Sequence, residues 1–313
     1  MQKLYSDYTV YQNGYVQRWV NMSEQEISVV IPTHNRGQRL IAAIDSALNN
    51  DKKLIKEIIV VDDNSTDNTQ DLIKRKYQNN KLIKYYKNEV SCGGAESRNI
   101  GVSHASGEWI AFLDDDDFWL NNKLEVQLSK AKKNPNTVAV SCAYIFKYPF
   151  GIKKKITLNE NYSRDDLLCN NILGGASLCL VKKSTFCEIG GFDKRLRSGQ
   201  DWDLWLRLDQ VGIISIVNKP LVIYDSYLGI RITRNNEARY LGRKLIYEKY
   251  KNELTEKSKK AQLSALYYSE ARLNSLKRRE RIQKLKSAVK YSDTIKGKFL
   301  FILSALPRIL INQ

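Results

Sequence analysis

The sequence lacks several features that would assign it to a common class of protein. Its five cysteines include no Cys-x-x-Cys pair, so neither a zinc-finger spacing nor a redox motif is present. The odd cysteine count favours reduced, buried thiols in a cytosol over a disulfide framework. The only two histidines, His34 and His104, have no partner pattern and are interpreted as structural.

Long apolar segments are also missing. The first 21 residues are mixed polar and aromatic, without an apolar run after a basic start. They lack the composition of a secretory signal, so we expect the protein to stay in the cytoplasm. Residues 299–303 and 309–311 are apolar, but Pro307 interrupts them. With fewer than ~18 uninterrupted apolar residues this stretch is too short to span a bilayer, although it can lie in the interface.

Acidic residues are outnumbered, with 34 Asp and Glu against 51 Lys and Arg and a formal net charge of +17. Most of the excess is C-terminal, since residues 236–313 hold 19 basic and 7 acidic residues, a net charge of +12. A basic tail can bind nucleic acid or the anionic face of a bilayer. Composition does not choose between these two partners.

The first part of the chain alternates apolar runs with helical patterns. Residues 27–33, 57–62, 82–86 and 109–113 are predicted strands. Periodic apolar positions predict helices at residues 40–48, 72–77 and 95–106. This alternation predicts an α/β fold with a mostly parallel sheet covered by helices on both faces. Functional sites in such sheets lie at the carboxyl ends of the strands.

The later part of the chain predicts an extension of the same domain. Strand-like pieces occur at residues 138–146, 177–181 and 213–217, and a helix is predicted at 201–211. From residue 237 onward the pattern indicates helices rich in Lys and Arg. We therefore divide the chain into an N-terminal extension (1–26), a main domain (27–235) and a basic helical segment (236–313).

Four consecutive aspartates, Asp114 to Asp117, directly follow the predicted strand at 109–113. Their mutual repulsion requires a cation, and hard oxygen ligands on a short loop suit Mg²⁺ or Mn²⁺ bridging to a diphosphate. The alternative is a solvated acidic loop that caps a helix starting near Asn122. The residue pattern leaves both interpretations open.

Other polar groups also follow predicted strands or open helices. Asp62 and Asp63 end the second strand, where a carboxylate can accept from a base N–H or a ribose hydroxyl, or belong to a turn and cap. Asp201 either caps its helix or is held over a cleft by the turn before it. Gly174 and Gly175 form a turn or permit close approach of a ligand to the backbone.

Taken in order, Pro-Thr-x-Asn, Asp-Asp, the Asp-rich run and Asp-Trp-Asp resemble glycosyltransferase family 2, whose catalytic domain has the GT-A fold. The resemblance covers residues 27–233 and is nearest to bacterial enzymes that build O-antigen or capsule repeat units. It implies a UDP-binding half at 27–117 and an acceptor-binding half at 118–235. Gln200 departs from the pattern, because many members have Glu before the catalytic Asp.

The resemblance also implies roles for individual residues. Asp201 would be the catalytic base, Asp116 the ligand of Mn²⁺ or Mg²⁺, Asp63 the partner of uracil, and Arg231 a cation that closes over the diphosphate. The implied nucleotide-sugar-binding residues are Pro32, Thr33, Asn35, Arg36, Asp63, Arg98, Asp114, Asp115, Gly174, Gly175 and Arg231.

The implied activity is inverting transfer of a hexose from a UDP-sugar, with UDP-glucose or UDP-galactose and a β-1,3 linkage as the specific expectation. The acceptor would be a sugar on undecaprenyl diphosphate at the inner face of the cell membrane, where the basic segment meets anionic lipid. A sugar nucleotidyltransferase is disfavoured because residues 32–37 lack a Gly-rich loop. A nucleic-acid-binding protein is disfavoured because the sequence lacks the usual modules of that class. A dehydrogenase is disfavoured because the sequence lacks a Gly-x-Gly-x-x-Gly motif after a strand.

Overall fold

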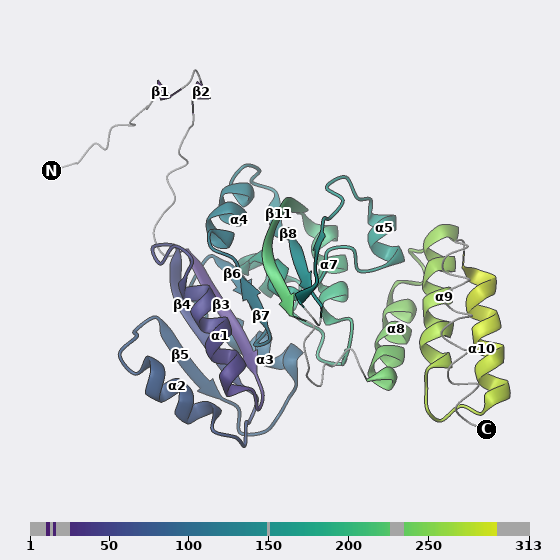
Figure 1. Ribbon diagram of the computed structural model, residues 1–313. Helices are drawn as coiled ribbons and strands as arrows, with labels where there is room; N and C mark the ends of the chain where they lie inside the picture. The colour runs from purple at the N-terminus through teal and green to yellow at the C-terminus, as the bar shows by residue number, and fades with distance from the viewer. Residues whose placement is uncertain (1–10, 13–14, 17–25, 149–150, 226–234, 293–313) are drawn as a thin grey trace.

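The computed structural model describes residues 11–12, 15–16, 26–148, 151–225 and 235–292. Its main feature is a nine-stranded sheet in the order β5-β4-β3-β6-β10-β8-β11-β7, with β9 paired to β8 (Figure 1). A short hairpin, β1 (Tyr11–Gln12) with β2 (Tyr15–Val16), precedes it. The strands of the large sheet are β3 (Ile27–Thr33), β4 (Ile55–Asp62), β5 (Ile83–Lys87), β6 (Trp109–Phe112), β7 (Asp117–Trp119), β8 (Thr137–Lys147), β9 (Lys153–Ile156), β10 (Leu180–Lys182) and β11 (Ile213–Asp225).

The first four strands in the sheet order are parallel, as the alternating pattern predicts. β5, β4, β3 and β6 pair in parallel, so their carboxyl ends share one edge. β10 then runs antiparallel to both of its neighbours, β6 and β8. The parallel pair β8 and β11 follows, and β7 closes the far edge antiparallel to β11.

Seven helices of the described main domain connect or cover the strands: α1 (Gly37–Leu48), α2 (Thr69–Tyr77), α3 (Gly94–His104), α4 (Lys123–Ala131), α5 (Arg164–Cys169), α6 (Lys183–Glu188) and α7 (Gln200–Val211). Every residue of β3 is buried, as expected for a strand covered on both faces. Close packing of α3 depends on Gly101, because a Cβ there would stand 2.3 Å from Val30 Cγ1.

The predicted strands and helices of the first half are confirmed within a few residues. The segment at 177–181 differs, since it begins as a 3₁₀ turn, Ala176–Leu178, before β10. β11 runs well beyond the predicted 213–217. β7, β9, α5 and α6 were not predicted, because elements of three to six residues are too short to show a period.

Three helices follow the sheet domain, which confirms the helical prediction for the basic segment: α8 (Asn236–Tyr250), α9 (Glu256–Ala271) and α10 (Arg278–Tyr291). They stack side by side at one end of the molecule (Figure 1). In the described part of the chain, no helix combines the length and apolar character needed to cross a membrane. The apolar stretch at 299–311 lies outside the described residues.

All five cysteines are free thiols, as predicted, but the expectation that they are buried is only partly correct. Cys142 and Cys179 are buried, whereas Cys92 and Cys187 are exposed. The exposed pair lies outside the strands: Cys92 is in the loop after β5 and Cys187 is in α6.

Candidate active site

A cavity of about 660 Å³ opens at the carboxyl ends of the parallel strands, where the fold predicts a site. It gathers most of the residues that the sequence singled out: Pro32, Thr33, Arg36, Asp63, Arg98, Asp114, Asp115, Asp116, Gly174, Gly175 and Asp201. Asn35 is not part of its lining; its side-chain oxygen accepts from the Thr66 N–H at 2.8 Å and joins two loops. Arg231 lies outside the described residues.

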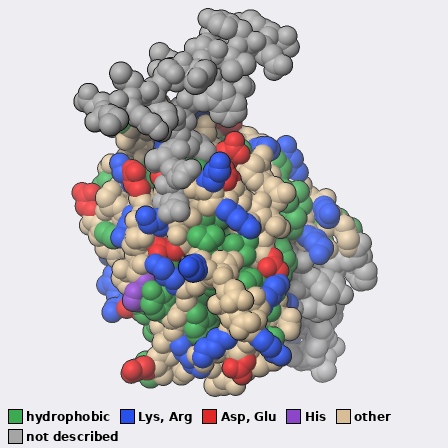
Figure 2. Space-filling view, turned by 90° about the vertical axis from the view of Figure 1, so that its left-hand side faces the viewer, with side chains coloured by type: hydrophobic (Ala, Val, Ile, Leu, Met, Phe, Trp, Pro, Cys, Tyr) green, Lys and Arg blue, Asp and Glu red, His purple; other side chains and the backbone are tan. Residues whose placement is uncertain are grey.

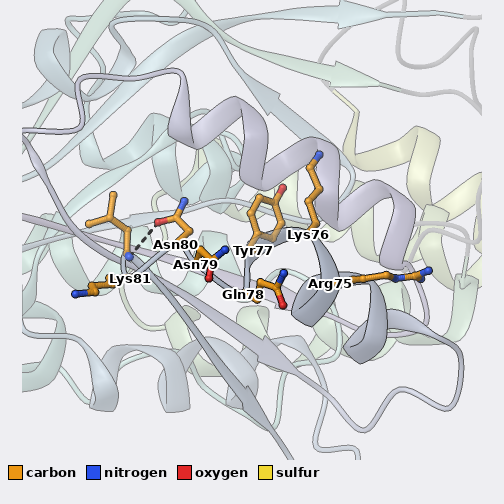
Figure 3. A pocket seen from close by; sticks show the side chains of 8 residues that line it. Arg75, Lys76, Tyr77, Gln78, Asn79, Asn80 and Lys81 are labelled. Carbon is orange, nitrogen blue, oxygen red and sulfur yellow. Dashed lines mark hydrogen bonds between the residues drawn. The ribbon is translucent and has the colours of Figure 1, made fainter.

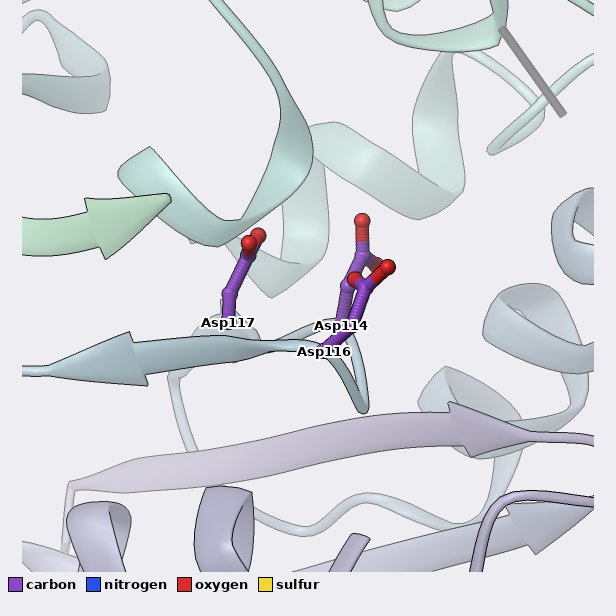
Figure 4. Close-up of side chains that lie close together, drawn as sticks. All are labelled: Asp114, Asp116 and Asp117. Atoms are coloured by element: carbon purple, nitrogen blue, oxygen red, sulfur yellow. The ribbon is translucent and has the colours of Figure 1, made fainter. Parts of the chain in front are cut away.

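The acidic run forms the turn between β6 and β7 on one side of this cavity. Oxygens of Asp114, Asp116 and Asp117 lie within 4.8 Å of one another, and their side chains point to the same side of the chain (Figure 4). All are partly or fully buried, and α4 has Asn122 as its N-cap residue. The solvated helix-cap interpretation is therefore wrong, while three adjacent carboxylate oxygens suit a hard divalent cation.

Asp115 points away from that trio toward the loop after β3. It accepts hydrogen bonds from the Thr33 hydroxyl at 2.8 Å and from Arg36 Nη1 at 2.9 Å. Arg36 also pairs with Asp116 at 3.3 Å. Burial raises the pKa of Asp115 to about 6, against the lowering effect of Arg36. These contacts join the ends of β3 and β6.

Arg98, on α3, connects the acidic turn to α7. Its guanidinium pairs with Asp114 and donates to Gln200 Oε1 at 3.2 Å. The side chain is 11% exposed, and its guanidinium carbon lies 5.4 Å from the centre of the Phe192 ring. A buried cation at this position offsets part of the negative charge around it.

Asp201 is in the first turn of α7, but it does not cap that helix. The N-cap residue is Gly199, in a left-handed conformation with φ of 80°, and no side-chain cap bond is present. The Asp201 carboxylate instead accepts from the Ala176 N–H. Its Oδ1 is buried without a hydrogen-bond partner among the described residues. The sequence alternative of a helix cap is therefore wrong.

The electrostatic surroundings of Asp201 favour its neutral form more than water does. Burial raises its pKa to about 6, Arg98 opposes that rise, and Asp114 adds to it. A carboxyl group with this pKa is ionised at neutral pH but is a stronger base than an exposed aspartate.

Two nearby aspartates serve the scaffold. Asp203 is fully buried and accepts from Lys249 Nζ at 2.6 Å, the Tyr250 hydroxyl at 3.0 Å and Arg207 Nε at 2.9 Å. It therefore holds α7 against α8. Asp193 pairs with Arg195 at 2.7 Å. Neither side chain lines the cavity.

Asp63, at the end of β4, is already rich in hydrogen bonds. Its oxygens accept from the Ser91 hydroxyl at 2.7 Å, the backbone N–H groups of Cys92 and Gly93, both at 2.8 Å, and Asn88 at 2.9 Å. Although burial acts in the opposite direction, these donors hold the pKa of Asp63 well below its usual range. Asp63 thus shapes the 88–93 loop, and its predicted contact with uracil stays a prediction.

Sequence reasoning missed an aromatic side of the cavity. Tyr144 and Phe146, two residues apart on β8, share a face, and Tyr224 on β11 lies 4.8 Å from Tyr144 between ring centroids. His34 also lines the cavity, although it was interpreted as structural; its Nδ1 is 2.8 Å from the Asp63 carbonyl. The period-two spacing of Tyr144 and Phe146 is visible in the sequence, but the pairing with Tyr224 depends on the parallel register of β8 and β11.

The match to a known family agrees with this geometry. The family model described as Glycosyl transferase family 2 matches residues 28–186, half of the chain. The chain belongs to glycosyltransferase family 2. An uncharacterized glycosyltransferase of Haemophilus influenzae is 31% identical over 62% of this chain and 66% of its own length, just under two thirds.

One curated relative of this family 2 chain has a named reaction. The Escherichia coli protein UDP-Glc:alpha-D-GlcNAc-diphosphoundecaprenol beta-1,3-glucosyltransferase WfgD is 32% identical over 63% of this chain and 75% of its own length.

Solved structures confirm the GT-A fold. S. aureus TarS residues 1–349 in complex with UDP-GlcNAc aligns with a TM-score of 0.63 at 19% identity, covering 85% of this chain and 80% of that one. A mannosyltransferase of Pyrobaculum calidifontis with GDP-Man and Mn²⁺ aligns with a TM-score of 0.57 at 17% identity, covering 94% and 84%. At these identities the likeness establishes the fold and leaves substrates open.

A second hollow of this glycosyltransferase lies away from the strand carboxyl ends. Residues 75–82 line it, where α2 ends and the chain turns toward the start of β5 (Figure 3). Its hydrogen bond between Asn80 Oδ1 and the Leu82 N–H, 3.1 Å long, stabilises that turn. The lining contains no carboxylate, so the acid-rich cavity is the better candidate for sugar transfer.

Proposed function

We propose that the chain is an inverting hexosyltransferase that uses a UDP-sugar, with Asp201 as the catalytic base. The observation that carries this proposal is the buried Asp201 carboxylate, which lines the cavity with one oxygen unpartnered among the described residues. An acceptor hydroxyl that donates to this oxygen would satisfy it and be aligned for proton transfer.

The charges of the cavity explain why the donor needs a cation. Its lining contains six carboxylates, from Asp63, Asp114, Asp115, Asp116, Asp117 and Asp201, and two guanidinium groups, from Arg36 and Arg98. An anionic diphosphate would be repelled by this surplus unless positive charge were added.

The chemistry of the acidic turn fits Mn²⁺ or Mg²⁺. Asp114, Asp116 and Asp117 each offer a carboxylate oxygen within 4.8 Å of the others. A divalent ion bound there would offset the charge that develops on the departing UDP. The family resemblance implies Asp116 as the main ligand of this ion, and the geometry adds Asp114 and Asp117 as candidate ligands.

The position of each residue in the cavity suggests its role in the transfer reaction. Asp201 takes the proton of the acceptor hydroxyl as that oxygen attacks the anomeric carbon, and direct displacement inverts the configuration there. Thr33, Arg36 and Asp63 lie at the strand ends proposed to hold the nucleotide. Asp201 works in its ionised form, so we expect catalysis above a pH of about 6.

The donor and acceptor proposals draw on the relatives. The E. coli relative is named for transfer from UDP-Glc to a GlcNAc on diphosphoundecaprenol, and a solved neighbour holds UDP-GlcNAc. We propose UDP-glucose or UDP-galactose as donor and an undecaprenyl-diphosphate-linked sugar as acceptor, joined in a β-1,3 linkage. Residues 27–117 would bind the donor and residues 118–235 the acceptor.

A lipid-linked acceptor requires the enzyme to work at a membrane surface, and α10 suits that task. Its described surface exposes basic side chains at its start and along its length: Lys277, Arg278, Arg279, Lys286 and Lys290. On the face of the molecule seen in Figure 2, by contrast, Lys and Arg are scattered among acidic and apolar groups. We propose peripheral association with the inner, anionic face of the cell membrane through residues 236–313, and no nucleic-acid partner.

A donor panel tests the proposal. The full chain is incubated with Mn²⁺, a synthetic lipid diphosphate carrying GlcNAc, and UDP-glucose, UDP-galactose, UDP-GlcNAc or GDP-mannose in separate reactions. We expect product from a UDP-hexose, with the new linkage β by NMR. Product from GDP-mannose alone would overturn the donor assignment, and an α linkage from an α-configured donor would overturn inversion.

A further inference from the structure

A short stretch of chain, residues 174–178, touches both halves of the proposed machinery; we call it the bracket. It lies between α5 and β10 and includes the 3₁₀ turn Ala176–Leu178. Its central residue, Ser177, is fully buried. A buried serine at this position needs partners for its polar atoms, and the identity of those partners is informative.

Ser177 holds the acidic turn from both ends. Its Oγ accepts the backbone N–H of Asp114 at 3.0 Å, at the start of the turn. Its carbonyl accepts from Trp119 Nε1 at 3.0 Å, just past the turn. One residue therefore fixes the two ends of the loop that carries all four aspartates.

The same bracket holds the base. The Ala176 N–H donates to the Asp201 carboxylate, and the Gly174 carbonyl accepts from Trp205 Nε1 at 2.8 Å. Both partners belong to α7, one turn apart. The bracket thus contacts the base and the acidic turn through two consecutive residues, Ala176 and Ser177, with Gly174 as a second anchor on α7.

The outer side of the bracket is fixed as well, by a buried polar chain from α4. Gln127 Nε2 donates to the Leu178 carbonyl at 2.7 Å, and Gln127 Oε1 accepts from Lys123 Nζ at 2.7 Å. The Lys123 ammonium sits 4.1 Å from the centre of the Trp119 ring. Because Trp119 in turn donates to the Ser177 carbonyl, these contacts form a closed network. The bracket therefore has little freedom to move independently of α4 and the acidic turn.

We propose that Ser177 is a positioning residue that sets the acidic turn relative to Asp201 and thereby tunes binding of the divalent ion. The inference rests on the proposed function, because it assumes that the acidic turn binds that ion. Partners that orient ligand-bearing groups typically affect metal affinity by about 10- to 100-fold. Ser177 touches neither the ion nor the sugar in this account; it acts through the backbone of Asp114.

The test compares Ser177→Ala with Ser141→Ala, a matched control. Ser141 is equally buried, and its hydroxyl donates to the Leu173 carbonyl at 2.9 Å, just before the bracket and away from the acidic turn. Binding of Mn²⁺ is measured directly, from the electron paramagnetic resonance signal of the free ion, with and without UDP. Thermal melting with and without Mn²⁺ is measured in parallel.

We expect about 10-fold weaker Mn²⁺ binding in Ser177→Ala and a change under about twofold in Ser141→Ala. Trp119→Phe removes the other bond to Ser177 while keeping a ring near Lys123, and it should also weaken Mn²⁺ binding. Equal Mn²⁺ affinity in Ser177→Ala, Trp119→Phe and the wild type would overturn the positioning role and leave the metal proposal standing. Absence of Mn²⁺ binding by the wild type would overturn the metal proposal, and this inference with it.

Discussion

The backbone N–H of Gly175 donates to the Tyr224 hydroxyl at 3.1 Å, and a Cβ at Gly175 would stand only 2.8 Å from that oxygen and 3.6 Å from Asp201 Oδ2. A side chain at this position would therefore force the Tyr224 hydroxyl to move, although the φ of −84° is ordinary for any residue. The glycine is required by space between the base and the aromatic side of the cavity rather than by backbone conformation.

Gly175→Ala should therefore impair transfer more than it impairs folding or UDP binding. The methyl group displaces the Tyr224 hydroxyl, which lines the cavity together with Asp201, and a shift of about 1 Å near the reacting groups can cost about 10²-fold in rate. Steady-state turnover and UDP affinity by calorimetry check this expectation. A variant that keeps its rate while losing UDP affinity would place Gly175 in the nucleotide half instead.

Substitutions at two neighbouring acids separate the roles within the acidic turn. Asp116 is one of the three clustered carboxylates, whereas Asp115 is occupied by Thr33 and Arg36. Asp116→Asn should weaken Mn²⁺ binding at least about 10-fold, since it removes a charged ligand. Asp115→Asn should keep Mn²⁺ affinity within a few-fold. If Asp115→Asn weakened Mn²⁺ binding more than Asp116→Asn did, the register of the metal site would be shifted by one residue.

Substitution by asparagine should change the stability of the folded protein in opposite directions at Asp201 and Asp203, two aspartates of α7. The folded-state pKa of Asp201 is raised to about 6, so the folded protein binds more protons than the unfolded chain between pH ~4 and ~6, and stability falls as pH rises through that window. Asp201→Asn removes this effect. The variant should be more stable than wild type by about 3 kcal/mol at pH 7, with no gain below pH 4.

Asp203→Asn is the matched comparison, two residues further along the helix. It leaves Arg207 and Lys249 without their shared buried carboxylate. The free energy of unfolding should therefore fall by about 3 kcal/mol. Urea denaturation at pH 4 and pH 7 measures both variants. Equal destabilisation at pH 7 would mean that Asp201, like Asp203, is a scaffold residue.

Charge reversal on α10 tests the membrane proposal with the full chain. Lys286 and Lys290 are exposed, and each basic side chain near an anionic surface contributes about 1 kcal/mol to binding. The double variant Lys286→Glu with Lys290→Glu should bind vesicles containing anionic lipid at least about 10-fold more weakly. The control reverses two exposed lysines in the turn before β4, Lys52→Glu with Lys53→Glu. Equal losses of vesicle binding in both double variants would show that only the net charge of the protein matters.

Local patterns in the sequence were enough to predict the parallel half of the sheet. β3, β4, β5 and β6 are short apolar runs, each followed by a turn or helix signal, and the run of aspartates stands out directly after β6. Asp63, Arg98 and Asp201, which the sequence also singled out, line the cavity.

The remaining features depend on contacts between distant segments. Tyr144 and Tyr224 meet because β8 and β11 pair in parallel across 80 residues of sequence. Ser177 begins the strand-like piece predicted at 177–181, and only the antiparallel pairing of β10 places it against the acidic turn. Lys123 is fully buried against Trp119, a contact that no local pattern in the sequence indicates. Tertiary pairing, rather than local propensity, decides each of these positions.

The turnover of Asp201→Asn tests the account most directly. The change keeps the shape of the side chain and removes its ability to take a proton at neutral pH. With saturating UDP-sugar, acceptor and Mn²⁺ at pH 7.5, we expect turnover to fall about 10²–10⁴-fold, the scale of a positioned base, with UDP and Mn²⁺ affinities unchanged. A variant that keeps more than about a tenth of the wild-type rate would contradict the assignment of Asp201 as the base.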